Sequence, residues 1–318
     1  MAKKEQNFIE KLQQKFDTFQ QAHPTVGYPY AIIKKYGDDE AGYQAALIAY
    51  YGFLAFFPLL IVATAVIERF ARNSVELREA FIESVTRYFP AIGPNLADSI
   101  NSPTSTGIVL LVGVLITLYG ARGVADAVRH ALNHVWAVPR HKRIGFPKSV
   151  LNSFTMIFLG GLGLVVSAAL SGYATSSDHG TLARIVMWFS GFTMLFIVFW
   201  AVFTFASSAR RRPFSNVPGA LLLAAGVTIL QTIGVYIITR QLSSQSGINA
   251  QFAVVLAMLF WMYLQAQLFL FAIELNCVRA LGLWPRSLNN KPPTPADRKA
   301  YAMYQQRETF HVDEPIKH

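Results

Sequence analysis

The sequence has one cysteine, Cys277, and few charged residues for its length of 318. A single cysteine excludes the intrachain disulfide framework that small secreted proteins use. Only 14% of the residues are charged and 53% are hydrophobic, a balance that excludes an ordinary soluble domain. The first 43 residues have no apolar core of signal-peptide type, so we expect the first membrane span to direct insertion. The composition therefore indicates a membrane protein without disulfide bonds.

Catalytic motifs are also missing from the sequence. There is no GxSxG, no phosphate-binding GxxxxGK[ST] and no GxGxxG after a strand. A nuclease would need clustered carboxylates for metal ions or an acid–base pair aimed at phosphate. Asp126 and Glu274 are the only acidic side chains expected at membrane depth, and both have cationic candidates nearby. We therefore expect neither enzymatic activity nor a cofactor.

What the sequence does contain is long apolar stretches, which predict an all-α polytopic membrane protein with six transmembrane helices. Each stretch is near the roughly 20 residues that cross a bilayer as a helix. The predicted spans are Ala45–Ile67, Gly107–Trp136, Leu151–Ala174, Ile185–Ala206, Asn216–Ile238 and Phe252–Leu275.

Polar segments flank this core and divide the chain into three parts. Residues 1–43 form a basic amphipathic segment, expected to lie on the membrane surface or to pack against loops of the protein itself. Residues 44–280 form the six-helix domain, with a further amphipathic segment at 68–106 on the outer surface. Residues 281–318 are rich in proline and charge and are expected to be a mobile extension.

Lys and Arg are distributed unevenly between the two sides of the predicted helices. The N-terminal segment, the region after span two counted from Arg122, the loop after span four and the C-terminal tail carry 22 of the 28. Basic residues favour the cytoplasmic side, so both termini are predicted to be cytoplasmic.

The second span ends with a polar face. Arg122, Asp126, Arg129 and Asn133 follow at i, i+4, i+7 and i+11, which places them on one side of a helix. Ionisable residues at membrane depth are candidates for a functional site. The alternative is a metal site, because Asp126, His130 and His134 lie at i, i+4 and i+8 on the same helix. Arg122 and Arg129 would repel a cation, so we expect no metal.

The sixth span offers a second polar face, formed by Tyr263, Gln267 and Glu274. Spans two and six run in the same direction, which brings Glu274 to about the depth of Arg129. A lone carboxylate near hydrocarbon costs several kcal/mol unless it is paired. We therefore predict an ion pair between Glu274 and either Arg129 or Arg122.

Other positions have roles in packing, movement or lipid contact. Pro58 lies inside the first span and is the predicted hinge. Gly163, Ser167 and Ser171 predict close helix packing inside the protein, with a dimer contact as the alternative. The predicted headgroup contacts are Arg140, Lys142, Arg143, Arg210, Arg211 and Arg212. Despite the net charge of +10, we expect anionic lipids as partners and no nucleic acid; a homo-oligomer stays open.

Four stretches together resemble the YihY/BrkB family of bacterial inner-membrane proteins, some of which carry an old ribonuclease BN label. They are AALIAYYGFLAFFPLL, RGVADAVRHALNHVW, VPGALLLA and WMYLQAQLFLFAIELN, and the resemblance covers roughly residues 45 to 280. The positions that match the family are Tyr50, Pro58, Asn133, Pro218, Gly219, Ala220, Glu274 and Asn276. The chain departs from the family at Ala272 and Ile273, where Gly and Ala are usual. The resemblance implies six spans and the bacterial cytoplasmic membrane.

Two functions from different classes follow from these features. The first is a transporter or flippase-like protein for an anionic envelope lipid, in which Arg122 and Arg129 receive the headgroup. The second is a non-transporting scaffold in envelope maintenance, in which the same charges lock helices together. A ribonuclease, as in the old family label, is a third reading that the residues do not support.

Overall fold

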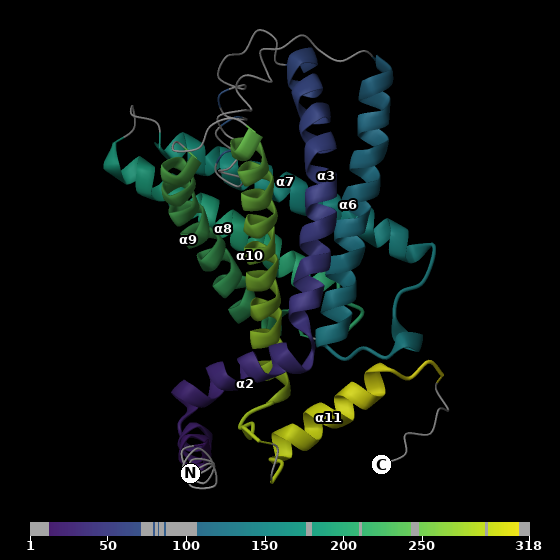
Figure 1. Ribbon diagram of the computed structural model, residues 1–318, viewed down its shortest axis with the longest axis vertical. Coiled ribbons are helices and arrows are strands. Elements are labelled where there is room, and N and C mark those ends of the chain that lie inside the picture. Colours follow the sequence, from purple (N-terminus) through teal and green to yellow (C-terminus); the bar gives the residue numbers. More distant parts are fainter. Residues whose placement is uncertain are drawn as a thin grey trace.

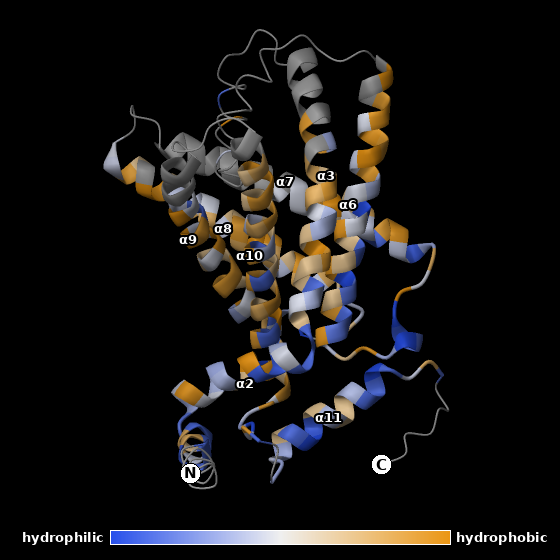
Figure 2. Cartoon of the chain, viewed as in Figure 1, coloured by the Kyte–Doolittle hydropathy of each residue, from blue (hydrophilic) through white to orange (hydrophobic). Residues whose placement is uncertain are grey.

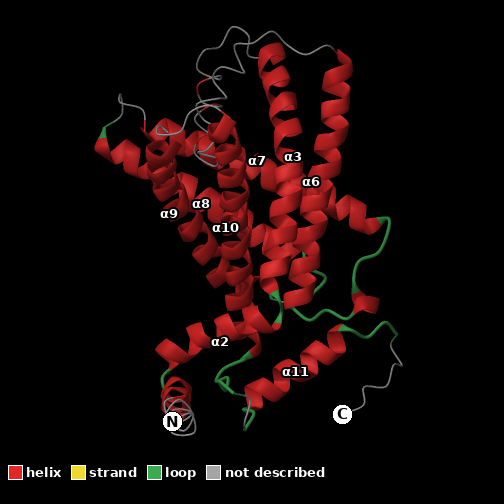
Figure 3. Cartoon of the chain, in the orientation of Figure 1, coloured by secondary structure: helices red, strands yellow, loops and turns green. Residues whose placement is uncertain are grey.

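The computed structural model describes residues 13–70, 107–175, 180–209, 212–242, 248–289 and 292–311, together with Glu79, Ile82 and Thr86. The described residues form helices joined by loops, and no strand occurs among them (Figure 3). The long helices are α3 (Ala41–Phe70), α6 (Gly107–Val135), α7 (Lys148–Thr175), α8 (Thr181–Phe205), α9 (Val217–Leu242) and α10 (Ile248–Leu281). The shorter ones are α2 (Pro24–Asp38), α11 (Pro295–Arg307) and the 3-10 helices η1 (Arg140–Lys142) and η2 (Pro213–Asn216). The predicted all-α fold is therefore confirmed for the described part of the chain.

The molecule has two layers that differ in polarity. The long helices form an apolar bundle, and a polar layer of α2, α11 and the helix of residues 13–22 lies across one end of it (Figures 1 and 2). We call this polar part the terminal layer, because the first and last described helices belong to it. Figure 1 shows α2 and α11 on this same side of the bundle.

Among the residues that the structure describes, five helices are long and apolar enough to cross a membrane. They cover Ala41–Leu60, Leu111–Val135, Thr181–Phe205, Pro213–Gly234 and Phe252–Leu281. Large apolar side chains lie exposed along them, as on Leu111 (61%) and Leu115 (59%) of α6, which is typical of a lipid-facing surface. The predicted third span lies in α7, a helix of 28 residues and so long enough to span a bilayer. The side chains of α7 after Gly163 lie outside the described part. The chain is thus a membrane protein with five candidate spans, and the sixth stays a prediction.

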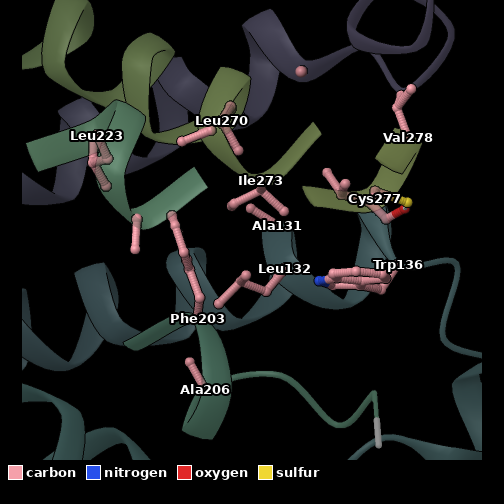
Figure 4. Packing of buried hydrophobic residues seen from close by; sticks show 14 of the residues in the cluster. Ala131, Leu132, Trp136, Phe203, Ala206, Leu223, Leu270, Ile273, Cys277 and Val278 are labelled. Carbon is pink, nitrogen blue, oxygen red and sulfur yellow. The ribbon is translucent and has the colours of Figure 1, made fainter. Parts of the chain in front are cut away.

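The buried core lies at the end of the bundle next to the terminal layer. Leu132 of α6, Phe203 of α8, Leu223 of α9 and Ile273 of α10 pack together there, all at most 2% exposed (Figure 4). The cluster also includes Ala31 of α2 and Ala300 of α11, so it extends from the bundle into the terminal layer. Hydrophobic burial therefore joins the two layers.

Small residues allow two helix pairs to approach closely. A Cβ added at Gly120 of α6 would lie 2.7 Å from the Cβ of Ala55 in α3. One added at Gly163 of α7 would lie 2.0 Å from Cγ2 of Val198 in α8. The contact of Gly163 is thus inside the protein, as predicted, whereas Ser167 and Ser171 lie outside the described side chains.

The expectation that residues 281–318 are a mobile extension is wrong for the described part. Thr294 caps α11: its hydroxyl accepts a hydrogen bond from the Asp297 amide, and the Asp297 carboxylate accepts one from the Thr294 amide. Asp297 also accepts a hydrogen bond from the guanidinium of the fully buried Arg286. The tail folds because these polar contacts replace the apolar periodicity that it lacks.

The helix of residues 13–22 contacts this same C-terminal region. Gln20 donates a hydrogen bond to the carbonyl of Arg286 at 2.6 Å, and Asp17 accepts one from the Leu288 amide at 2.8 Å. Of the two expectations for the N-terminal segment, packing against the protein's own loops is therefore the one observed here. The predicted outer amphipathic segment at 68–106 lies almost wholly outside the described residues.

Candidate functional site: a cationic pocket beside α6

The polar face of α6 lines an open pocket of about 600 Å³. All four predicted face residues, Arg122, Asp126, Arg129 and Asn133, border it. The helical spacing places them together because residues four and seven apart share a side of the helix. Leu47 and Tyr51 of α3 form the opposite wall, and Arg143 closes the pocket from the loop after η1.

Asp126 is the one carboxylate among the residues that line this pocket. Its Oδ1 lies 2.9 Å from Nη2 of Arg129, and its Oδ2 lies 3.6 Å from Nε of Arg122. Ser153 of α7 donates a further hydrogen bond to Oδ1 at 2.7 Å. Asp126 is thus engaged by α6 and α7, and the described residues contain no group of three or more His, Cys, Asp or Glu placed to hold a metal.

The pocket has more cationic than anionic groups. Arg122, Arg129 and Arg143 supply three guanidiniums against the single Asp126 carboxylate. Nη1 of Arg129 is buried and finds no acceptor in the part of the chain that the structure describes. Arg143 donates its Nε to the carbonyl of Val138 at 3.1 Å. An anionic oxygen in the pocket would therefore meet donors that the protein itself leaves unmatched.

Burial and the neighbouring Arg140 lower the pKa of Arg143, because a second cation and a partly dry site both disfavour its charge. The guanidinium stays protonated at neutral pH, since the ordinary arginine pKa lies above 12. Repulsion between Arg140 and Arg143 makes the charged form of Arg143 less favourable. An anion bound in the pocket would offset this repulsion.

Asn133 borders the pocket, but its contacts are structural. Its Oδ1 accepts hydrogen bonds from the Ser208 amide at 2.8 Å and the Ser207 hydroxyl at 3.3 Å, and its side chain is almost fully buried. These bonds tie the segment after α8 to α6. Asn133 therefore fixes the end of the polar face.

The predicted ion pair of Glu274 with Arg129 or Arg122 is wrong. Glu274 Oε2 lies 3.0 Å from Nζ of Lys35, which comes from α2 in the terminal layer, while both arginines pair with Asp126. The sequence predicts that residues 1–43 lie on the membrane surface or pack against loops of the protein, and neither position suggests Lys35 as a partner of Glu274. The spacing of Lys35 and Asp39 at i, i+4 on a helix with apolar neighbours was the one signal that could have identified it.

The other predicted residues of α10 lie away from the α6 pocket. Asn276 accepts a hydrogen bond from the Gly219 amide at 2.7 Å and donates one to the Asn216 carbonyl at 3.3 Å, so it holds the start of α9. The hydroxyl of Tyr263 faces Gly42 of α3, with 3.7 Å between it and an added Cβ. Gln267 is half-buried within α10.

The predicted headgroup contacts fall into three groups. Arg143 lines the pocket, whereas Arg140 pairs with Glu308 after α11 at 2.9 Å. Lys142 at the end of η1 and Arg212 just before η2 are both exposed. Arg210 and Arg211 lie outside the described residues. Pro58 lies inside α3, and its role as a hinge stays a prediction.

Comparison with known proteins places the chain in a family. The family model described as "Virulence factor BrkB" matches residues 32–295. The "Putative ribonuclease-like protein YfkH" of Bacillus subtilis (strain 168) is 21% identical over 260 residues, which cover 78% of this chain and 93% of that protein. A "UPF0761 membrane protein" of Albidiferax ferrireducens is 22% identical over 244 residues, covering 72% of this chain and 56% of that protein. No solved structure matches the chain significantly. Since the family model spans most of the sequence, the chain belongs to the BrkB virulence factor family.

Proposed function

We propose that this protein binds the anionic headgroup of an envelope lipid in the α6 pocket and moves the lipid between leaflets. The observation that carries the proposal is the open pocket lined by three guanidiniums and one carboxylate. Phosphate oxygens are the acceptors that suit an arginine fork.

The surroundings of the pocket support a lipid rather than a free anion. Leu115 and Leu118 of α6 are 59% and 44% exposed, and they lie about two turns and one turn from Arg122 along the same helix. A headgroup in the pocket would leave its acyl chains on this apolar surface. Pro58 in α3 is where the helix opposite could bend during transfer.

The proposal also includes the bacterial inner membrane, with both termini in the cytoplasm. The excess of Lys and Arg in the terminal segments supports this orientation. The location of α2 and α11 in one layer agrees with an even number of spans. We propose no enzymatic activity and no nucleic acid partner; the ribonuclease-like name belongs to the Bacillus relative.

The test is lipid scrambling by the full-length protein in vesicles with fluorescent phosphatidylglycerol or, for comparison, phosphatidylcholine. We expect faster transfer of the anionic lipid and a roughly tenfold or greater loss in R129A, because a hydrogen bond to a charged group contributes about 1.5–3 kcal/mol. R298A is the control: it removes an exposed arginine of α11 that does not line the pocket. Wild-type transfer in R122A, R129A and R143A alike would remove the proposal.

A scaffold without transport is the second candidate, and the buried ion pair of Lys35 with Glu274 favours it. In that case the charges only lock α2 to α10. Replacing both residues together by well-packed apolar ones, K35M with E274L, would then leave abundance and function intact. Loss of lipid transfer in this folded double variant would instead count against the scaffold.

A further inference from the structure

A second charged cluster lies where α2, α10 and α11 meet, on the terminal-layer side of the core. Its members are Lys35, Asp39, Glu274 and Arg307, which we call the buried carboxylate site. Lys35 and Glu274 are 0% exposed and Asp39 is 1% exposed, whereas the Arg307 side chain is 12% exposed. None of these four residues lines the α6 pocket.

Lys35 is shared between two carboxylates. Its ammonium group donates hydrogen bonds to Asp39 and, at 3.0 Å, to the carbonyl of Val135 in α6. Its third close neighbour is Oε2 of Glu274 at 3.0 Å. One ammonium group thus donates hydrogen bonds to two acceptors, Asp39 and Val135, and lies at ion-pair distance from Glu274.

The two carboxylates are compensated unequally. Asp39 has a cation on each oxygen, Lys35 on Oδ2 and Arg307 on Oδ1, the latter at 2.9 Å. Glu274 has one cationic partner, Lys35. Neither of its oxygens accepts a hydrogen bond from the residues that the structure describes. Glu274 is therefore the less stabilised of two neighbouring acids.

The charges of the fully buried groups decide which form of Glu274 fits the site. With both acids ionised, Lys35, Asp39 and Glu274 sum to −1 where no water reaches them; with one proton added, they sum to zero. Arg307 is partly solvated, so its charge compensates the interior less. A buried carboxylate without hydrogen bonds is unfavourable when charged, and two adjacent acids that compete for one cation retain a proton between them.

The other titratable groups around the site do not supply the missing charge. Glu274 and Asp39 lie against each other, and the remaining neighbours are mostly neutral at physiological pH. From α2, α6, α10 and α11 respectively they are Tyr36, His134, Cys277 and Tyr304. Protonated Glu274 gains an acceptor in Asp39 as well as keeping Lys35 as a donor.

We propose that Glu274 is a proton-binding site, occupied at neutral pH and sharing its proton with Asp39. The proton comes from water on the side of the site where Arg307 is partly exposed. It forms an O–H bond on Glu274. No other bond changes, and the net charge of the four residues rises from zero to +1. Loss of the proton makes Glu274 compete with Asp39 for Lys35, which links proton exchange to the junction of α10 with α2. This inference does not depend on lipid binding.

Infrared spectroscopy of the full-length protein in lipid nanodiscs tests the proposal directly. Glutamate carrying carbon-13 at its side-chain carboxyl shifts the carboxylic-acid C=O band of a protonated glutamate. We expect such a band at neutral pH in the wild type, its loss in E274Q and its retention in E308Q, where the substituted glutamate is 52% exposed. Absence of a shifted band in the labelled wild type, or its persistence in E274Q, would overturn the assignment.

Thermal unfolding provides a second readout with the same variants. Gln resembles the protonated acid, so E274Q should keep the wild-type melting temperature at neutral pH, whereas D39N should lower it. A clear drop in E274Q would mean that Glu274 is ionised, because Lys35 would then have lost a charged partner. If E274Q fails to fold, the labelled wild type still decides, since Glu274 is the only buried glutamate among the described residues.

Discussion

Charged side chains gather in two regions of this membrane protein, the terminal layer and the α6 pocket, and the two regions pair them differently. In the terminal layer, Arg286 contacts both Asp297 and Asp38 and is 0% exposed. In the pocket, Arg122 and Arg129 share one carboxylate and are 48% and 15% exposed. The same residue type is thus buried between two carboxylates in one place, and in the other place two arginines share a single carboxylate.

The difference separates charges that hold the fold from charges available to a ligand. A fully buried arginine cannot be reached by an outside group, and its loss leaves two carboxylates without their shared cation. An arginine that lines an open pocket and shares its carboxylate with a second arginine contributes less to the fold. It retains the capacity to bind an anion.

The largest effect is expected from Arg286→Gln in the terminal layer. The substitution leaves Asp297 and Asp38 without their shared cation in a buried position, so we expect a loss of about 3–5 kcal/mol in unfolding free energy. Arg140→Gln is the control, since the Arg140–Glu308 pair is about half exposed and should contribute less than about 1 kcal/mol. Denaturation of both variants in the same detergent measures the difference. Equal losses would mean that burial does not distinguish these pairs.

A smaller effect is expected at the contact between α3 and α6, which forms the pocket walls. Gly120→Ala places a Cβ 2.7 Å from the Ala55 Cβ. This overpacking pushes the two helices apart and should lower the unfolding free energy by about 1–3 kcal/mol. Gly160→Ala in α7 meets nothing within 4 Å, so there the better helix propensity of Ala should be neutral or stabilising. Thermal unfolding of the two variants checks this contrast. A stable Gly120→Ala protein would show that the helices are not held at this distance.

Acid should weaken the terminal layer. Burial alone would raise the pKa of Asp297, but the hydrogen bonds from Arg286, Ser287 and Thr294 outweigh it and lower that pKa below its usual value near 3.9. A lowered folded-state pKa gives stability that is present above about pH 4 and is lost as the pH falls further. Hydrogen exchange of α11, corrected for intrinsic rates, should therefore accelerate below about pH 4. Asp297→Asn should exchange faster at neutral pH and lose this dependence.

The helices of the bundle were predictable because long uncharged runs have one stable form in a bilayer. The stretch Gly107–Trp136 and the observed α6 (Gly107–Val135) differ by one residue. The shared face of Arg122, Asp126, Arg129 and Asn133 followed from helical spacing alone. Local patterns thus gave both the main helices and one wall of the pocket.

Contacts between distant segments were not predictable in this way. Lys35 and Glu274 are far apart in the sequence. Matching the depths of residues along spans two and six suggested Arg129 as the partner of Glu274, because that comparison did not include α2. The C-terminal tail was expected to be mobile from its proline content. The Thr294-Pro295-Ala296-Asp297 sequence, a capping residue with an acid three positions later, was a local signal for α11.

The smallest stability effect is expected from Arg129→Gln in the pocket, the same substitution proposed for Arg286. Asp126 keeps Arg122 and the Ser153 hydroxyl as partners, so unfolding should change by less than about 1 kcal/mol. Lipid transfer should nevertheless fall, because the substitution removes one of the three guanidiniums that line the pocket. Parallel denaturation of the two Gln variants measures the contrast between the regions. If Arg129→Gln were as destabilising as Arg286→Gln, the pocket would be part of the structural core, and its surplus charge would not indicate a ligand.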